Sequence, residues 1–190
     1  MKVIGINGSP RRKGNTEILL GEVMKGAASA GAEVKTIVLN KLKITACQHC
    51  DVCSEAGKCR IKDDMQQIYL DLEQSDRLVL ASPVQFLGPT AQMKAMIDRC
   101  QALWARKYVL KMPPLGDRRE RKGLFVSVGA LKMANLFDPS IAIVKALFTV
   151  LDVTYAGELL FRGVDEIGAI YKYSGALEEA FIAGKRLVED

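Results

Sequence analysis

Histidine and long apolar runs are the features that this 190-residue sequence has least of. No apolar stretch reaches the roughly 18 residues that a membrane span needs, so no membrane helix is expected. The apolar run after Met1 and Lys2 is too short for the core of a secretory signal and leads directly into a glycine-containing turn. The single histidine, His49, lies outside any motif that would orient it toward a nucleophile, which disfavours a Cys–His hydrolase. We therefore expect a cytoplasmic protein.

The composition is that of an ordinary globular domain. Hydrophobic residues make up 49% of the chain and charged residues 26%, values that suggest neither disorder nor a fibre. At this length one domain spanning 1–190 is expected. In a reducing compartment, clustered cysteines point to metal or redox chemistry more than to structural disulfides.

The net charge of +5 is concentrated in the segment 105–122, where seven lysines and arginines face two acidic residues. We interpret this segment as an insertion loop. A solvated loop and a docking surface for an anionic cofactor or acidic partner both fit it. Nucleic acid is disfavoured as a partner because the segment has one aromatic residue, Tyr108, and no recognisable binding motif.

Apolar strands alternate regularly with amphipathic helices along the chain. The strands are expected at 2–7, 33–39, 77–82, 123–128 and 153–161, and the helices at about 16–30, 63–74, 90–105, 139–151 and 174–188. Such alternation predicts a parallel sheet with helices on both faces. Ligands of these sheets bind beyond the carboxyl ends of the strands. The segments 8–16, 83–88 and 127–130 should therefore form the site.

The first of these segments reads GSPRRKGNT, from Gly8 to Thr16. Placed between a strand and a helix, it can present backbone N–H groups and the positive end of the helix dipole to an anion. It has neither the G-x-x-x-x-G-K-[ST] nor the G-x-G-x-x-G spacing, which argues against a P-loop NTPase and a dinucleotide fingerprint. An ordinary turn is the alternative, since Gly, Ser, Pro and Asn are common turn residues. The position after the first strand favours anion binding.

Four of the five cysteines lie in the loop 46–60, as Cys47, Cys50, Cys53 and Cys59. Three interpretations compete. Tandem C-x2-C steps followed by a further cysteine suit a [4Fe–4S] cluster, which takes four thiolates. Zinc also accepts four thiolates, but its two C-x2-C pairs usually lie well apart in sequence. Free thiols without a metal are the third interpretation.

Two stretches resemble the signatures of the NADPH-dependent FMN reductase-like flavoproteins, a branch of the flavodoxin-like fold. They are GSPRRKGNT and, at 82–99, SPVQFLGPTAQMKAMIDR. With the cysteine loop and KDDM at 62–65, the resemblance covers roughly the first hundred residues. It implies a three-layer α/β sandwich whose five-stranded parallel sheet has the order 2-1-3-4-5, and a single FMN-binding domain.

The resemblance also assigns three groups of FMN-binding residues. Around the phosphate it places Ser9, Arg11, Lys13, Gly14, Asn15 and Thr16. Around one side of the isoalloxazine and the ribityl chain it places Pro83, Val84, Gln85, Phe86, Leu87 and Gly88. Along the other edge of the ring it places Ser127, Val128, Gly129 and Ala130. The family usually has an aromatic residue where Gln85 stands, so Phe86 or a neighbouring subunit is expected to supply the stacking contact.

The cysteine loop is similar to the compact motif of the iron–sulfur flavoproteins, a subgroup of the same family. This resemblance implies that Cys47, Cys50, Cys53 and Cys59 hold a [4Fe–4S] cluster. It also implies that electrons pass from a ferredoxin-like donor through cluster and FMN to a small acceptor such as a quinone, oxygen or peroxide. Because the loop follows the second strand, it is expected on the side where the flavin ring is exposed.

Two alternative functions stay open. One is a cluster-free NAD(P)H-dependent FMN or quinone reductase, and the other is a non-enzymatic flavodoxin-like electron carrier. A homodimer or homotetramer is expected, because family members commonly cover the flavin with a neighbouring subunit. Trp104, Tyr108 and Pro113–Pro114 are the candidate interface residues.

Overall fold

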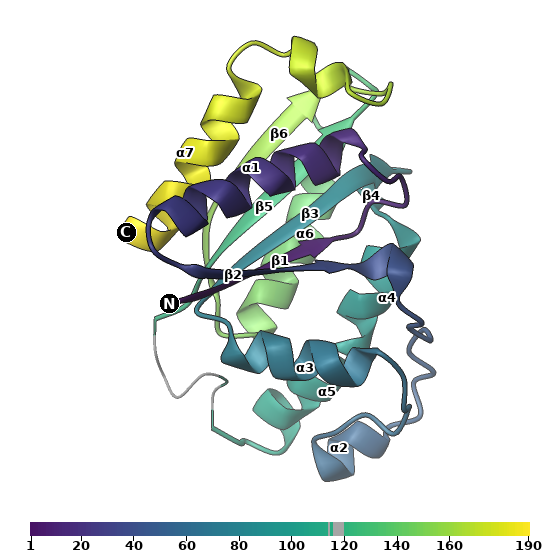
Figure 1. The fold of residues 1–190 in the computed structure, drawn as a ribbon. Helices are drawn as coiled ribbons and strands as arrows, with labels where there is room; N and C mark the ends of the chain where they lie inside the picture. Colours follow the sequence, from purple (N-terminus) through teal and green to yellow (C-terminus); the bar gives the residue numbers. More distant parts are fainter. Residues whose placement is uncertain (114, 116–119) are drawn as a thin grey trace.

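Five parallel strands form the centre of the molecule (Figure 1). The computed structural model describes residues 1–113, 115 and 120–190. The strands are β1 (Lys2–Asn7), β2 (Glu33–Val38), β3 (Arg77–Gln85), β5 (Lys122–Gly129) and β6 (Thr154–Arg162). They pair in the order β2-β1-β3-β5-β6, which confirms the predicted order 2-1-3-4-5. A two-residue strand, β4 (Gly88–Pro89), pairs antiparallel with the end of β3.

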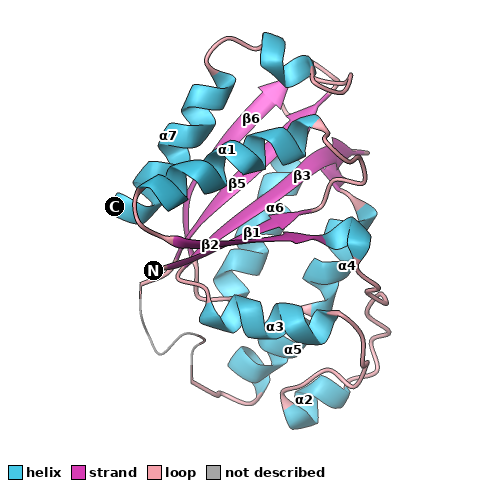
Figure 2. Cartoon of the chain, in the orientation of Figure 1, coloured by secondary structure: helices cyan, strands magenta, loops and turns pink. Residues whose placement is uncertain are grey.

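Helices cover both faces of the sheet, as Figure 2 shows. Helices α1 (Asn15–Ser29) and α7 (Ala176–Glu189) lie on one face. Helices α3 (Met65–Gln74), α4 (Ala91–Arg99) and α6 (Asp138–Val150) lie on the other. Alternate strand residues separate into the two cores: Leu78 and Leu80 face α3 and α4, while Val79 faces α1. The predicted three-layer sandwich is confirmed.

The two helices on the α1 face pack through glycines. A Cβ added to Gly26 of α1 would lie 1.9 Å from the Phe181 carbonyl oxygen, and one added to Gly184 of α7 would lie 1.9 Å from the Val23 carbonyl oxygen. No side chain fits at either position, so the two helix backbones approach closely. Each helix that the structure describes is too short or too polar to cross a bilayer.

The predicted helix 90–105 is wrong as one continuous element. Helix α4 ends at Arg99, a short helix α5 occupies Gln101–Trp104, and Ala105–Val109 continues as a π-helical turn. The break has a local cause. The Arg99 carbonyl accepts a hydrogen bond from the Tyr69 hydroxyl (2.7 Å), and the Leu103 N–H turns to the Cys100 carbonyl instead. A distant hydroxyl thus takes an acceptor that a regular helix would use internally.

Two other segments differ from expectation. Strand β3 continues past Pro83 to Gln85, because β5 and the antiparallel β4 still pair with it there. Its other neighbour, β1, ends opposite Ala81. Pro83 is tolerated there because β3 has no partner strand on that side that would need a backbone N–H. The cysteine loop contains a short helix, α2 (Val52–Ala56). Single 3₁₀ turns also occur at Leu39–Lys41 and Ala169–Lys172.

Candidate functional site

A pocket of about 190 Å³ lies at the carboxyl edge of the sheet, where the three predicted segments meet. Its lining residues are Ser9, Pro10, Arg11, Gly14, Asn15, Thr16, Pro83, Val84, Gln85, Val128, Gly129, Ala130, Val164 and Asp165. Eleven of these positions belong to the sixteen assigned to FMN from the sequence. We call this the edge pocket.

The turn that enters α1 leaves backbone donors free for an anion. Gly14 is the N-cap residue and offers no side-chain cap, so the first N–H groups of this 15-residue helix have no partner from a capping side chain. A Cβ on Gly14 would lie 3.1 Å from Cβ of Arg11 and 3.2 Å from its carbonyl oxygen. The turn is therefore tight, and the first N–H groups of α1 are available to bind a phosphate group.

Asn7 supports this turn from below. Its Oδ1 accepts the Ser9 N–H (2.9 Å), and Oγ of Ser9 in turn accepts the Arg11 N–H (3.2 Å). Asn7 is fully buried, and its Nδ2 has no hydrogen-bond partner among the described residues. A buried donor without a partner beside an anion-type turn is compatible with a bound polar group.

Buried hydroxyls join the strand ends that frame the edge pocket. Thr90 Oγ1 donates to the Gly8 carbonyl (2.6 Å), and the Thr90 N–H donates to Oγ of Ser82 (3.0 Å). Ser127 Oγ donates to the Ser82 carbonyl (2.7 Å). The sequence pattern predicts Thr90 only as the start of a helix. Its hydroxyl fixes the first phosphate-loop residue to the turn after β3.

Five of the assigned FMN residues lie outside the lining of the edge pocket: Lys13, Phe86, Leu87, Gly88 and Ser127. Ser127 is fully buried between strands. Lys13 has a φ of 53° and donates its N–H to the Glu17 carboxylate (2.6 Å). Asn15 lines the pocket, but its Nδ2 donates to the Glu166 carbonyl (2.8 Å) and holds the loop after β6. Long-range partners of this kind leave no signal in the sequence.

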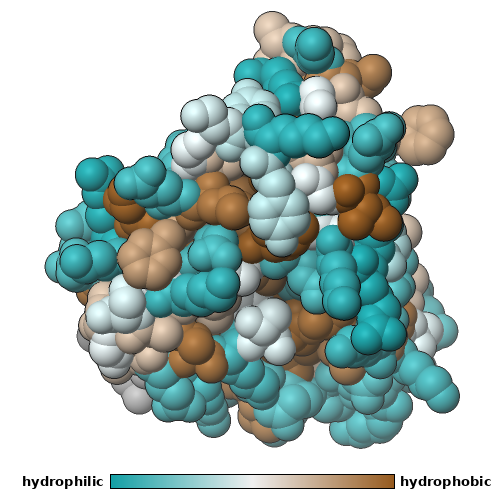
Figure 3. All heavy atoms as spheres, turned by 45° about the horizontal axis from the view of Figure 1, so that its top comes forward, coloured by the Kyte–Doolittle hydropathy of each residue, from teal (hydrophilic) through white to brown (hydrophobic). Residues whose placement is uncertain are grey.

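A second hollow, of about 640 Å³ and mainly apolar, adjoins the edge pocket. The two share Val84, Gln85, Gly129 and Ala130, and the hollow adds Phe86, Leu87, Leu131 and Leu136. Phe86 and Leu87 form the tip of the β3–β4 turn with φ values of 48° and 65°, and the Phe86 side chain is completely exposed. In the view of Figure 3 the apolar surface occurs as small patches among hydrophilic side chains. A shallow apolar hollow beside a polar turn suits a planar ring attached to a phosphate-bearing chain.

Two residues at the rim of the edge pocket, Val164 and Asp165, had no signal in the sequence. They follow β6, and Arg11 Nη1 reaches across to them, donating to the Asp165 carbonyl (2.8 Å). The Arg11–Asp165 ion pair at 3.7 Å is largely exposed, so it contributes little to stability. It does place a cation at the mouth of the pocket.

The four clustered cysteines line one small pocket of about 20 Å³. We call it the thiol pocket. Arg60, Ile61, Arg99, Gln101 and Ala102 are among its other lining residues. In the part of the chain that the structure describes, no group of three or more potential ligands is arranged to hold a metal ion. The donor set fits a thiolate-ligated centre in its chemistry and in its convergence on one pocket.

The backbone of the cysteine loop is tightly curved. His49, Asp51 and Gly57 have φ values of 49°, 58° and 66°. Burial raises the pKa of the Cys53 thiol, and the neighbouring Cys59, Cys47 and Cys50 raise it further. The thiols are thus close enough to influence one another. Cys100, the fifth cysteine, stands apart from the loop: it is buried, and burial raises its pKa to about 12.

The ends of the cysteine loop are tied to α4. Arg99 donates to the carbonyls of Thr45 (2.7 Å) and Ile61 (3.3 Å), which lie just outside the first and last cysteines. Asp63 pairs with Arg99 (2.8 Å) and also accepts the Thr45 N–H (2.9 Å). Burial opposes ionisation of Asp63, but hydrogen bonds from Arg99, Thr45 and Met65 outweigh it and lower its pKa. The predicted helix start at 63–64 therefore has a second role as the base of the loop.

The thiol pocket and the edge pocket share no lining residue. The chain leaves β2 beside the phosphate loop, where Asn40 Nδ2 donates to the Pro10 carbonyl (3.1 Å). It then runs to α2, away from the phosphate loop (Figure 1). The expectation that the cysteines lie on the flavin side thus describes the start of the loop, while its thiols gather near α4 and α5.

The charge of segment 105–122 is largely engaged within the chain. Lys107 pairs with Asp152 (2.7 Å), Arg106 lies 3.9 Å from Glu73, and Arg121 is buried and donates to the Ser75 carbonyl. Lys122 pairs with Glu120 (3.4 Å). The first five residues of the segment are helical, and 114 and 116–119 lie outside the described residues. The expected docking role of this segment stays a prediction.

The sequence matches a known family over most of its length. The profile of the NADPH-dependent FMN reductase family matches residues 1–147. The chain belongs to this family. Its phosphate loop, the end of β3 and all of β5 lie within the matched range, so the edge pocket is built almost entirely from family sequence.

The relatives to which this chain is similar include several iron–sulfur flavoproteins. One from Archaeoglobus fulgidus is 47% identical over 106 residues, 56% of this chain and 54% of that protein. One from Methanocaldococcus jannaschii is 43% identical over 103 residues, 54% of this chain and 53% of that protein. The match therefore spans about half the length of these relatives.

A solved structure extends the comparison to the whole fold. An NAD(P)H:quinone oxidoreductase from Methanothermobacter marburgensis superposes with a TM-score of 0.72 over 98% of both chains, at 16% sequence identity. At that identity the likeness concerns the fold alone. It agrees with the flavodoxin-like sheet order described above.

Proposed function

We propose that this chain is an FMN-dependent oxidoreductase that carries a [4Fe–4S] cluster. The observation that carries the FMN assignment is the meeting of the phosphate loop, the end of β3 and the end of β5 in one pocket. The first-turn N–H groups of α1, Ser9 and Arg11 would hold the phosphate. Val84, Gln85, Gly129 and Ala130, which also line the apolar hollow, would contact the ring.

Bound FMN would supply the electron-transfer chemistry, because the reactivity of a flavin belongs to the cofactor. The chain would bind and orient it through the residues that line the edge pocket. The buried Thr90 and Ser127 hydroxyls hold the strand ends rigid. No side chain of the edge pocket has to act as an acid or base.

Cys47, Cys50, Cys53 and Cys59 would hold the cluster through their thiolates. The support is their convergence on one pocket, together with the similarity to relatives named iron–sulfur flavoproteins. Anaerobic reconstitution followed by iron, sulfide and FMN analysis tests both assignments on one sample. Four irons and one FMN per chain are expected. Less than one iron per chain would remove the cluster from the proposal and leave the flavin.

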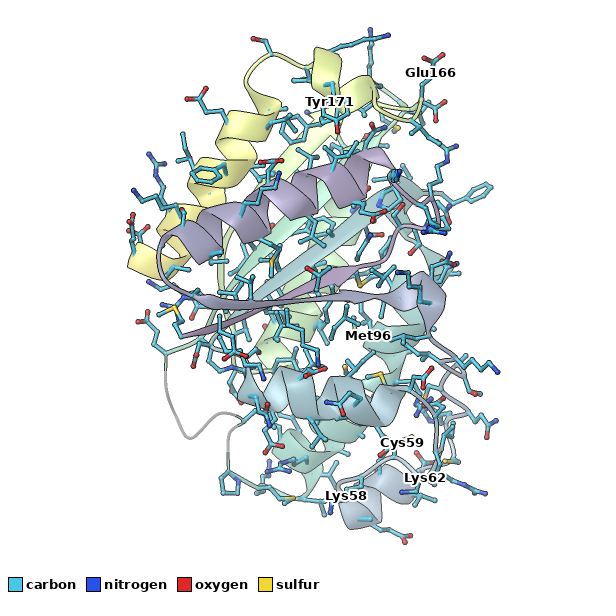
Figure 4. All side chains as sticks on the ribbon, in the orientation of Figure 1. Lys58, Cys59, Lys62, Met96, Glu166 and Tyr171 are labelled. Atoms are coloured by element: carbon cyan, nitrogen blue, oxygen red, sulfur yellow. The ribbon has the colours of Figure 1, made fainter. Side chains whose placement is uncertain are left out.

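We further propose that a ferredoxin-like, acidic protein delivers the electrons at the thiol pocket. Lys58, Arg60 and Lys62 are exposed, and none forms an ion pair with another described residue. Figure 4 labels Lys58 and Lys62 on either side of Cys59. Such free cations complement an acidic surface and steer its approach. The same electrons would leave the flavin to a small acceptor such as a quinone.

Reversing this charge tests the docking site. Lys58→Glu together with Lys62→Glu should slow reduction by an acidic ferredoxin at low salt by about tenfold or more, a loss of steering. Lys145→Glu together with Lys185→Glu is a matched control away from the thiol pocket, since it reverses the same number of exposed charges. Equal rates for the double variant and the wild type, or an equal loss in the control, would move the docking site elsewhere.

A cluster-free NAD(P)H-dependent reductase is the second candidate function. It is favoured by the family profile, which is that of the NADPH-dependent FMN reductases. Anaerobic addition of NADH or NADPH to the FMN-loaded protein decides between the two. Rapid bleaching of the flavin by a nucleotide supports the reductase, and bleaching only by a protein donor supports the primary proposal.

A further inference from the structure

One donor of a buried arginine is unused. Arg99 ends α4, and its side chain is fully buried. Nη1 donates to the Thr45 carbonyl and Asp63 Oδ2, and Nη2 donates to the Ile61 carbonyl and Asp63 Oδ1. A guanidinium has five N–H donors, so these four bonds leave Nε–H. Nε is buried and has no hydrogen-bond partner among the described residues.

The unused Nε–H donor belongs to a side chain that lies beside the clustered cysteines. Arg99 lines the thiol pocket together with all four clustered cysteines. A buried donor without an acceptor is unfavourable, and proteins rarely leave one unless a ligand or water completes it. Thiolate and sulfide sulfurs accept hydrogen bonds, and donors to them tune the potential of iron–sulfur centres.

The surroundings fix Arg99 firmly in this position. The Tyr69 hydroxyl donates to its carbonyl (2.7 Å), and the Asp63 carboxylate accepts from both terminal nitrogens. Asp63 therefore balances the charge of the guanidinium while leaving Nε free. Arg99 binds the carbonyls of Thr45 and Ile61, which lie on either side of the four clustered cysteines.

On the basis of the proposed function, we propose that Arg99 is a positioning residue for the cluster, donating its Nε–H to a sulfur held in the thiol pocket. The terminal nitrogens hold the two ends of the cysteine loop in place for the same contact. A hydrogen bond and a nearby positive charge both stabilise the more negative, reduced state. Arg99 therefore raises the reduction potential of the bound cluster.

The chain offers a matched control in Arg60. It lines the same pocket, but it is exposed and lies on the rim. Arg60→Gln removes one positive charge from the pocket and leaves the buried Nε donor in place. Arg99→Lys does the opposite: it keeps the charge and removes Nε–H. The pair separates a hydrogen bond from a general electrostatic effect.

The experiment compares reconstituted wild type, Arg99→Lys and Arg60→Gln in a redox titration followed by electron paramagnetic resonance. FMN content reports correct folding, because the edge pocket shares no residue with the thiol pocket. We expect the reduction equilibrium of Arg99→Lys to shift at least tenfold toward the oxidised cluster, about 59 mV for one electron. Arg60→Gln should shift it by less. Loss of an exchangeable-deuteron coupling in Arg99→Lys alone would add spectroscopic support.

The outcomes separate this inference from the proposed function. A wild type that binds less than one iron per chain overturns the cluster, and the inference falls with it. A wild type with four irons and an Arg99→Lys potential that is unchanged overturns only the inference, as does an equal or larger shift in Arg60→Gln. If Arg99→Lys retains no FMN, the double variant Asp63→Asn/Arg99→Gln is compared with the wild type, because it removes the buried ion pair as a whole and leaves no unbalanced charge. A tenfold shift between those two supports the proposal, and equal potentials overturn it.

Discussion

Replacing Thr90 by valine should weaken both the fold and the binding of FMN. Thr90 is fully buried, and its hydroxyl has two partners: it donates to the Gly8 carbonyl (2.6 Å) and accepts the Met93 N–H at the start of α4 (3.3 Å). Valine has nearly the same shape but neither function. The Gly8 carbonyl then loses its buried donor, and α4 loses its N-cap.

The magnitude follows from these two losses. A buried polar group left unsatisfied costs about 1–3 kcal/mol. Loss of an N-cap side chain costs about 0.5–2 kcal/mol. The two effects share one atom and do not add fully, so we expect a loss of about 2–4 kcal/mol in the free energy of unfolding. Thr90→Ser is the matched control, since it keeps the hydroxyl and removes one methyl group, worth about 1 kcal/mol.

The assays are urea unfolding followed by circular dichroism and titration of the protein with FMN. Gly8 begins the phosphate loop, so its release should weaken FMN binding by about tenfold, equivalent to about 1.4 kcal/mol. Thr90→Ser should bind FMN like the wild type. Equal stability of the valine and serine variants, or unchanged FMN affinity in a folded Thr90→Val protein, would refute the role given to this hydroxyl.

Three further predictions concern the rest of the molecule. The pKa of Asp63 is lowered in the fold, so its contribution to stability is complete above the unfolded pKa of about 3.9 and is lost as the pH falls below it. Asp63→Asn should therefore flatten the acid limb of urea midpoints measured between pH 7 and pH 3; an identical limb would exclude this carboxylate as its source. Burial and a pKa of about 12 should make Cys100 inert, so at pH 8 a thiol reagent should modify the four loop cysteines of the metal-free protein quickly and Cys100 only after unfolding. Trp104 and Tyr108 form a half-exposed aromatic pair with centroids 5.6 Å apart, and Trp104→Ala should shift the sedimentation profile toward smaller species if this pair joins subunits; an unchanged profile would place the interface elsewhere.

The strands and their order followed from local pattern. The run from Leu78 to Ala81 is apolar at every position because both faces of β3 are covered, and such runs can be recognised without any partner in view. The turn GSPRRKGNT was recognisable for a similar reason. Its small residues are needed by the backbone of the turn itself, as the close contacts around Gly14 show.

Helix boundaries and side-chain roles depended on residues far away in sequence. The break after Arg99 needs the Tyr69 hydroxyl, 30 positions earlier, and no property of residues 90–105 signals it. The resemblance places Asn15 at the phosphate, and only the fold shows that its amide also holds the loop at Glu166. Polar side chains can take any acceptor within reach, so only the packed chain decides which one they take.

Local sequence pattern is enough to predict a parallel α/β sheet, a phosphate-type loop at its edge and a set of four thiols capable of binding a metal. The tertiary structure decided that these thiols gather in one pocket, apart from the edge pocket, and that Arg99 and Asp63 anchor both ends of their loop. The physical reason is the range of the interactions involved. Backbone propensity and hydrophobic periodicity act between near neighbours, whereas buried charges and hydrogen bonds are paired across the fold by whichever groups the packing brings together.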